Sequence, residues 1–127
     1  MRLAGNESLL QMQYRAREMS YASRFPGAEE KMICLPDGRS VGRLVVYRQP
    51  GAMRLVDIGL LESHRGQGIG TALLKDLQQE CMDGGSRLEL QVARTNRAAQ
   101  LYLRMGFSVT SEDAMYAHMR WQPVRQA

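Results

Sequence analysis

A glycine-rich run, Arg65-Gly66-Gln67-Gly68-Ile69-Gly70-Thr71, constrains the fold of this 127-residue chain more than any other feature. It lies between an apolar stretch, residues 55–61, and a stretch with helical periodicity, residues 69–81. A helix that opens directly after a strand and a glycine turn leaves its first backbone N–H groups without partners, at the positive end of its dipole. Glycine removes the side chains that would hold a ligand away from those groups. The run therefore predicts a strand–loop–helix unit that binds a phosphate.

The spacing of this run does not fit two common nucleotide-binding motifs. A P-loop requires Lys and then Ser or Thr after its last glycine, whereas here Ile69 intervenes and Lys75 comes too late. The dinucleotide fingerprint requires a third glycine and an acidic residue at the end of a second strand, and Asp83 does not end a strand. A plain strand–helix connector without a ligand remains the alternative to a phosphate site.

Composition narrows the class of protein. A hydrophobic content of 44% and a net charge of +4 predict one soluble globular domain spanning residues 1–127. There is no membrane-length apolar run, no signal peptide in residues 1–10 and no nucleic-acid-binding motif, so we expect a cytoplasmic protein without membrane or nucleic-acid partners. Cys34 and Cys81 lack metal-ligand spacing, and both are predicted to be reduced thiols in the core.

Periodicity and turn chemistry predict alternating elements along the chain. A helix is expected over residues 7–22, ended by Pro26. A hairpin turn, Pro36-Asp37-Gly38-Arg39, joins two predicted strands. A second helix is expected to bury Ile69, Leu73, Leu77 and Cys81 along one face. The strands are predicted at residues 31–35, 40–47, 53–61, 88–92, 107–110 and 116–121, and the later helices at residues 68–82 and from Asn96 to Gly106.

Two motifs together point to one family. Arg65, Gly68 and Gly70 fit the pattern R-x-x-G-x-G, and the segment from Asn96 to Phe107 fits N-x-A-x-x-L-Y-x-x-x-G-F. In this order, with one strand-like run between them, they resemble the acetyl-CoA-binding segments of the GNAT superfamily of N-acetyltransferases. The resemblance covers roughly residues 32–121.

The resemblance implies an α/β (α+β) fold, with a mixed, mostly antiparallel central sheet flanked by helices. GNAT domains usually begin with a strand and a helix that this chain has no room for, so the expected form is shortened at its N-terminus. A missing first strand would expose a sheet edge, which proteins normally cover or pair. A homodimer is the expected means of covering it.

The resemblance also implies how acetyl-CoA is held. The backbone of Leu60, Leu61 and Glu62 would pair with the pantetheine arm, and an N–H near Leu60 would stabilise the oxyanion. The pyrophosphate would lie on the loop, formed by Arg65, Gly66, Gln67, Gly68, Ile69, Gly70 and Thr71. Asn96 would contact the cofactor or merely cap its helix.

The same resemblance assigns the proton transfers. Tyr102 matches the tyrosine that protonates the leaving thiolate, the alternative being a tyrosine packed on a helix face. Asp57, in the strand before the loop, is the expected general base, unless it forms a salt bridge with Arg54 or Arg43. His64 and Glu89 are further candidates for the base. His118 and Tyr116 are candidates to line the acceptor pocket.

The expected activity is transfer of an acetyl group from acetyl-CoA directly to a primary amine, without a covalent enzyme intermediate and without a metal. The acceptor would be a small molecule or a peptide, which the fold does not distinguish. The alternative is a non-catalytic acyl-CoA-binding module or a subunit of a larger assembly.

Overall fold

The computed structural model of the chain describes residues 25–123. The helix predicted over residues 7–22, and with it the predicted shortening of the N-terminus, lies outside the described residues. In chain order the elements are β1 (Glu29–Cys34), β2 (Ser40–Gln49), β3 (Ala52–Leu60), the short 3-10 helix η1 (Glu62–His64), α2 (Ile69–Gly84), β4 (Arg87–Ala93), α3 (Ala98–Arg104), β5 (Ser108–Glu112) and β6 (Tyr116–Trp121).

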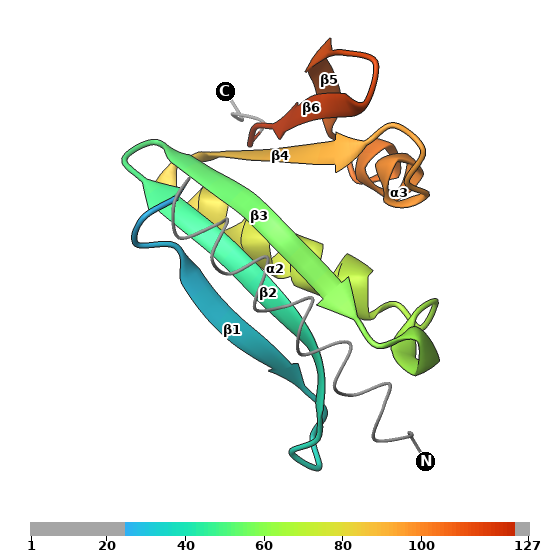
Figure 1. Cartoon of the computed structure of the whole chain (residues 1–127). Coiled ribbons are helices and arrows are strands. Elements are labelled where there is room, and N and C mark those ends of the chain that lie inside the picture. Colours follow the sequence, from blue (N-terminus) through green and yellow to red (C-terminus); the bar gives the residue numbers. More distant parts are fainter. Residues whose placement is uncertain (1–24, 124–127) are drawn as a thin grey trace.

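The strands form one sheet in the order β1-β2-β3-β4-β6-β5. Every neighbouring pair is antiparallel except β3 and β4, which run parallel because α2 carries the chain back between them. Figure 1 shows α2 behind β2 and β3, and α3 beyond the end of β4. The predicted fold class, a mixed and mostly antiparallel sheet with helices, is confirmed.

The two parallel strands separate after a short paired stretch. Their register runs only from Ala52 opposite Arg87 to Leu55 opposite Leu90. Beyond Leu55, β3 continues for five residues while remaining paired with β2 on its other side, as far as Leu60 opposite Gly42. In Figure 1 the ends of β3 and β4 diverge, and we call the end of the sheet where these two strands are no longer paired the β3–β4 opening.

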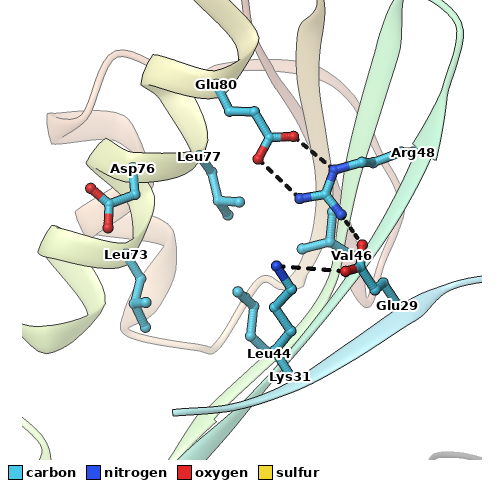
Figure 2. Close-up of a pocket in the computed structure, with 9 residues that line it drawn as sticks. All are labelled: Glu29, Lys31, Leu44, Val46, Arg48, Leu73, Asp76, Leu77 and Glu80. Atoms are coloured by element: carbon cyan, nitrogen blue, oxygen red, sulfur yellow. Dashed lines mark hydrogen bonds and ion pairs between the residues drawn. The ribbon is translucent and has the colours of Figure 1, made fainter. Parts of the chain in front are cut away.

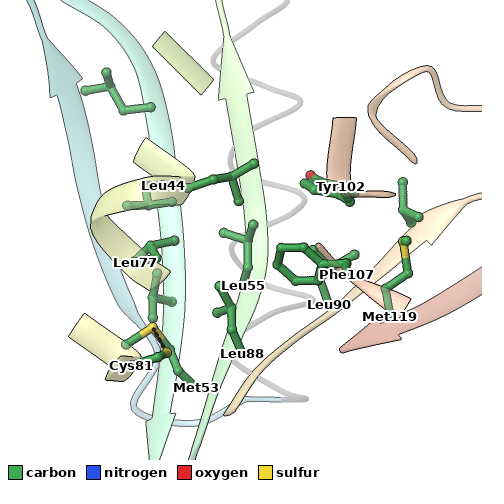
Figure 3. Close-up of a cluster of buried hydrophobic side chains, with 14 of the residues drawn as sticks. Leu44, Met53, Leu55, Leu77, Cys81, Leu88, Leu90, Tyr102, Phe107 and Met119 are labelled. Atoms are coloured by element: carbon green, nitrogen blue, oxygen red, sulfur yellow. Dashed lines mark hydrogen bonds between the residues drawn. The ribbon is translucent and has the colours of Figure 1, made fainter. Parts of the chain in front are cut away.

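The core fills the layer between the sheet and the two helices (Figure 3). Helix α2 buries Leu74, Leu77 and Cys81 in this layer, with Ile69 and Leu73 partly buried beside them. Leu77 and Cys81 are thus buried as predicted, whereas the predicted Ile69 and Leu73 are only partly buried. Leu74, which was not predicted, is buried as well. The strands contribute alternate residues, among them Val46, Met53, Leu55, Leu88, Leu90, Val92, Ala117 and Met119.

The two cysteines differ. Cys81 is fully buried, with its Sγ atom 3.9 Å from Sδ of Met53. Cys34 is exposed, so the prediction of a core thiol at this position is wrong. The reason is register, because Ile33 takes the inward position at the end of β1 and its neighbour points away. Both thiols are free. Among residues 25–123, no helix has the length and apolar character needed to cross a membrane.

Candidate active site

The glycine loop and the start of α2 follow the end of β3, on one side of the β3–β4 opening. Gly66 and Gly68 adopt left-handed φ angles of 73° and 82°, which L side chains rarely tolerate, and Gly68 directly precedes the helix. The N–H of Ala72 donates to the carbonyl of Gly68 at 3.0 Å. Within residues 25–123 the three N–H groups before it, those of residues 69–71, have no hydrogen bond. They are therefore available to an anion.

Open space surrounds these glycines. A Cβ atom built at Gly66, Gly68 or Gly70 would meet no atom within 4 Å. The glycines are thus not required by packing inside the protein. Their bare backbone faces solvent at the end of a 16-residue helix, as expected where a ligand approaches the main chain closely.

The end of β3 presents polar backbone groups toward the opening. The N–H of Leu61 donates to the carbonyl of Val41 in the neighbouring β2 segment at 2.8 Å. Successive residues of a strand point their backbone groups to opposite sides, so the N–H and carbonyl of Leu60 point away from β2. The Leu60 carbonyl is bound by Nε of Arg65 at 3.0 Å. Arg65 therefore folds the loop back onto the strand, and the Leu60 N–H faces the opening.

The turn between strand and loop is fixed by local hydrogen bonds. The N–H of Arg65 donates to the carbonyl of Glu62 at 3.2 Å. The side-chain amide of Gln67 donates to the carbonyl of Ser63 at 3.3 Å. The side chains of Glu62 and Gln67 are exposed beside the loop. These contacts hold the loop in shape without using the free N–H groups of α2.

Tyr102 and Asp57 come together across the opening from different elements. Tyr102 lies on α3, is only 6% exposed and packs its ring against Phe107, with centroids 5.6 Å apart. Asp57 lies on β3, beyond the point where pairing with β4 ends, and its Oδ2 atom is shielded from solvent. Burial raises the pKa of the Tyr102 phenol above its ordinary value of 10.0, and the negative charge of Asp57 raises this pKa further. The phenol is therefore neutral at physiological pH.

The residues proposed as partners of Asp57 are also engaged elsewhere. Arg43 is buried on β2 and forms an ion pair with Glu30 at 3.0 Å. Arg54 reaches from β3 to β4, where its Nη2 donates to Gln91 at 3.5 Å. Each of these two arginines thus binds a side chain on a neighbouring strand, Glu30 of β1 or Gln91 of β4.

Asn96 acts on the start of α3. Its Oδ1 accepts the N–H of Ala98 at 2.9 Å, and its own carbonyl accepts the N–H of Ala99 at 3.1 Å. The Asn96 side chain thus satisfies an N–H of the first turn, as a capping residue does, although Arg97 is the residue that directly precedes α3. Contact of the exposed Asn96 with acetyl-CoA stays a prediction.

His64 and Glu89, the two further candidates for the general base, lie beside other polar groups. His64 is half-buried in η1, with Nδ1 2.8 Å from Oγ of Ser63. Glu89 on β4 forms ion pairs with Arg87 on its own strand and with Arg120 on β6. Glu89 is therefore less suited than Asp57 to accept a proton.

The final hairpin places two further candidates on one strand. His118 is half-buried on β6, opposite Gln91 of β4 and Ser111 of β5. Tyr116 is exposed at the start of β6, opposite Ala93. Both belong to the half of the sheet on the β4 side of the opening, where an acceptor pocket remains a prediction.

Sequence reasoning missed Gln78. Its side-chain Nε2 donates to the carbonyl of Met105 at 2.9 Å, which joins α2 to the end of α3. A glutamine in a helix two positions before a glutamate looks like an ordinary solvent-facing residue. Only its neighbour Leu77, at an inward position, hinted that the side chain lies at the edge of the buried face.

A cavity of about 170 Å³ lies between α2 and the strands β1 and β2 (Figure 2). Arg48 binds Glu80 of α2 through Nε and Nη2, at 2.7 and 3.0 Å, and also pairs with Glu29 of β1. Lys31 pairs with Glu29 at 3.5 Å. The charges that surround the cavity therefore bind mainly one another and clamp the helix to the sheet. This cavity is lined by residues of β1, β2 and α2 and lies apart from the β3–β4 opening.

Comparison with solved structures shows the same fold. The structure of nourseothricin acetyltransferase is 25% identical to this chain in sequence, with a TM-score of 0.64. The match covers 76% of this chain and 66% of the nourseothricin acetyltransferase chain. The chain thus spans just under two thirds of that protein's length. The PaiA N-acetyltransferase from Thermoplasma acidophilum, in complex with coenzyme A, is 18% identical with a TM-score of 0.69. This match covers 97% of this chain and 81% of the PaiA chain. The ribosomal-protein-S18-alanine N-acetyltransferase from Escherichia coli is 23% identical with a TM-score of 0.68. This match covers 87% of this chain and 78% of the Escherichia coli chain.

Comparison by sequence gives the family. A search of curated proteins found no match. The family model described as "Acetyltransferase (GNAT) domain" matches residues 5–126, nearly the whole length. The two segments that carry the resemblance, the glycine loop (residues 65–71) and the segment from Asn96 to Phe107, both lie inside the matched region. The chain belongs to the GNAT acetyltransferase family.

Proposed function

We propose that this protein transfers an acetyl group from acetyl-CoA to a primary amine by direct attack. The observation that carries the proposal is the β3–β4 opening, which has free helix N–H groups at its loop end and Asp57 and Tyr102 on its two sides. Family membership supports acyl transfer as the reaction class. A related GNAT structure from Elizabethkingia anophelis, 18% identical with a TM-score of 0.63, contains bound acetyl-CoA.

The loop would hold the pyrophosphate of acetyl-CoA. The donors are the N–H groups of Ile69, Gly70 and Thr71, which gain strength from the dipole of α2. The pantetheine arm would lie along the end of β3, where the N–H of Leu60 faces the opening. Placed opposite the thioester carbonyl, this N–H would stabilise the negative charge that develops on oxygen during attack.

Asp57 and Tyr102 would act on the attacking amine and on the leaving sulfur, respectively. The amine nitrogen forms a bond to the thioester carbon, the C–S bond breaks, and the amine loses a proton to the Asp57 carboxylate, directly or through water. The sulfur leaves with the electron pair of the broken bond. Tyr102 would donate a hydrogen bond from its phenolic O–H to that sulfur as the negative charge develops.

The raised pKa of Tyr102 defines how it acts. An ordinary thiol has a pKa of about 8.5, so complete proton transfer from a phenol with a pKa above 10 to a free thiolate is uphill. Tyr102 therefore serves mainly as a hydrogen-bond donor to the departing sulfur. It contributes while the C–S bond is breaking and remains protonated afterwards.

A second copy of the chain would cover the free edge of the sheet. Within the described residues, β1 pairs only with β2, and Met32 on this edge strand is 54% exposed. An unpaired edge strand is a ready template for another strand. We propose a homodimer, which sedimentation equilibrium of the full chain tests directly.

Two measurements on the full chain test the proposed reaction. Calorimetric titration with acetyl-CoA, beside free CoA, should show micromolar binding; no binding to a folded sample would contradict the cofactor site. Amine acetylation should then fall about 100-fold or more in Tyr102→Phe with acetyl-CoA affinity unchanged, and stay unchanged in the control Tyr47→Phe, on β2 outside the opening. Binding without turnover on a panel of amines would favour the non-catalytic acyl-CoA-binding module.

A further inference from the structure

Helix α3, which carries Tyr102, is too short to hold its own position. It contains seven residues, Ala98–Arg104, and isolated helices of this length are unstable in water. Its last carbonyl groups have no partner within the helix. The position of the Tyr102 hydroxyl therefore depends on contacts that the end of α3 makes with the rest of the protein.

Hydrogen bonds from four groups fix that end. The N–H of Met105 donates to the carbonyls of Leu101 and Tyr102, at 2.9 and 3.1 Å, the N–H of Gly106 donates to the carbonyl of Leu103 at 3.1 Å, and the N–H of Phe107 donates to the carbonyl of Tyr102 at 3.0 Å. These bonds are local to α3. The fourth donor comes from outside, because the side-chain amide of Gln78 on α2 binds the Met105 carbonyl at 2.9 Å. Among residues 25–123, it is the one hydrogen bond between α2 and the segment 98–106.

The end of α3 is also packed tightly. Gly106 turns the chain with a φ angle of 96°, and a Cβ built there would lie 3.2 Å from the indole of Trp121. The backbone at Gly106 therefore has little freedom to move toward β6. Loss of the bond from Gln78 would leave the half-buried Met105 carbonyl without its donor, an unfavourable state that a shift of α3 would relieve.

The bond from Gln78 begins on the helix whose N-terminus would hold the pyrophosphate. Gln78 lies nine residues after Ile69, a distance of about 13.5 Å along the helix axis. A helix with Leu74, Leu77 and Cys81 anchored in the core moves as one piece. Contacts at the start of α2 are therefore linked through Gln78 to the end of α3.

We propose that Gln78 is a positioning residue, which sets the Tyr102 hydroxyl at the β3–β4 opening relative to the helix that binds acetyl-CoA. The inference rests on the proposed role of Tyr102. Gln78 does not touch the substrates in this arrangement and acts only through α3. Because displacement of a catalytic group by about 1 Å can cost up to ~100-fold in rate, loss of this single bond has a measurable effect on turnover.

The test compares variants with and without a donor at position 78. Gln78→Leu removes the donor and should lower kcat about tenfold, with KM for acetyl-CoA unchanged within about twofold. Gln78→Lys keeps a donor on a long side chain and should retain most of the activity. Gln79→Leu is the matched control, because the neighbouring Gln79 is exposed and binds Asp83 of its own helix. Thermal unfolding of each variant shows whether the fold is retained.

A double-mutant cycle with Tyr102→Phe decides the mechanism. If Gln78 acts through Tyr102, Gln78→Leu should have no further effect on kcat in the Tyr102→Phe background. A tenfold loss in both backgrounds, or equal loss in Gln78→Lys, would overturn the positioning role and leave the proposed function intact. Full activity of Tyr102→Phe itself would instead overturn the role of Tyr102, and with it this inference. If Gln78→Leu does not fold, the Gln78→Lys and Gln78→Glu pair, with and without a donor, carries the same comparison.

Discussion

Replacing Gly70 by alanine should stabilise the protein and weaken acetyl-CoA binding at the same time. Gly70 is the second residue of α2, its φ angle is not in the left-handed region, and a Cβ there meets no atom within 4 Å. Alanine therefore fits without strain and restricts the unfolded chain. A gain of about 0.5 kcal/mol follows, or roughly 2 °C in Tm for a chain of this size.

The effect on binding has the opposite sign because the methyl group occupies the approach to the N–H groups of α2. Losing one charge-assisted hydrogen bond to the pyrophosphate costs about 2 kcal/mol. That cost corresponds to roughly a 30-fold increase in Kd. Calorimetric titration with acetyl-CoA measures Kd, and differential scanning calorimetry measures Tm on the same samples.

Gly84→Ala is the matched control at the other end of the same helix. Its Cβ would lie 3.8 Å from Oγ of Ser86, an ordinary contact, and its φ angle is also not left-handed. It should give the same small rise in Tm with unchanged Kd. An unchanged Kd in Gly70→Ala would refute the placement of the pyrophosphate at the start of α2, and an equal loss in both variants would point to a change in the whole helix.

Two further predictions concern the sheet and its clamp. Gly42→Ala should destabilise the fold by roughly 1–3 kcal/mol in urea denaturation, because the new Cβ would lie 2.3 Å from the carbonyl oxygen of Gly59 on β3; wild-type stability would contradict this close approach. Glu80→Gln should cost up to about 1 kcal/mol at pH 7, a small value because Glu80 and Arg48 are 47% and 36% exposed. The Arg48 guanidinium lowers the pKa of Glu80 below its ordinary value of 4.5, so the contribution is present above that pH and disappears as the pH falls through the lowered pKa. Urea denaturation at pH 7 and pH 3 should show the difference between wild type and variant shrinking at pH 3, and a constant difference would contradict the argument.

Local chemistry made much of the fold predictable. The turn residues at 36–39 bind one another as expected, with Asp37 accepting the N–H of Arg39 at 2.9 Å. The left-handed Gly85 ends α2, as the Asp83–Ser86 segment indicated. The strand β6 has the predicted bounds, residues 116–121. These features depend on neighbouring residues in the sequence, so the sequence contains enough information to predict them.

Features that depend on distant contacts were not predictable in the same way. Strand β2 extends to Gln49 because this residue pairs with Ala52 of β3, which leaves only two residues in the turn. The β3–β4 pairing ends at Leu55, where the register of β3 with β2 shifts and leaves Val56 without an opposite residue. The contact of Gln78 with Met105 joins residues 27 positions apart. No periodicity in either segment indicates such a pair.

The β3–β4 opening has a consequence for how the protein assembles. The strands β1, β2 and β3 are joined by short turns, so their pairings close small loops, whereas pairing β3 with β4 closes a loop that contains all of α2. Because longer loops cost more chain entropy to close, we expect the meander β1–β3 to form before the two halves of the sheet dock. Leu60 and the glycine loop lie with the first half, and Tyr102 lies with the second. Neither half contains all parts of the proposed site, so we expect a chain that has folded only halfway to have secondary structure but no acetyltransferase activity.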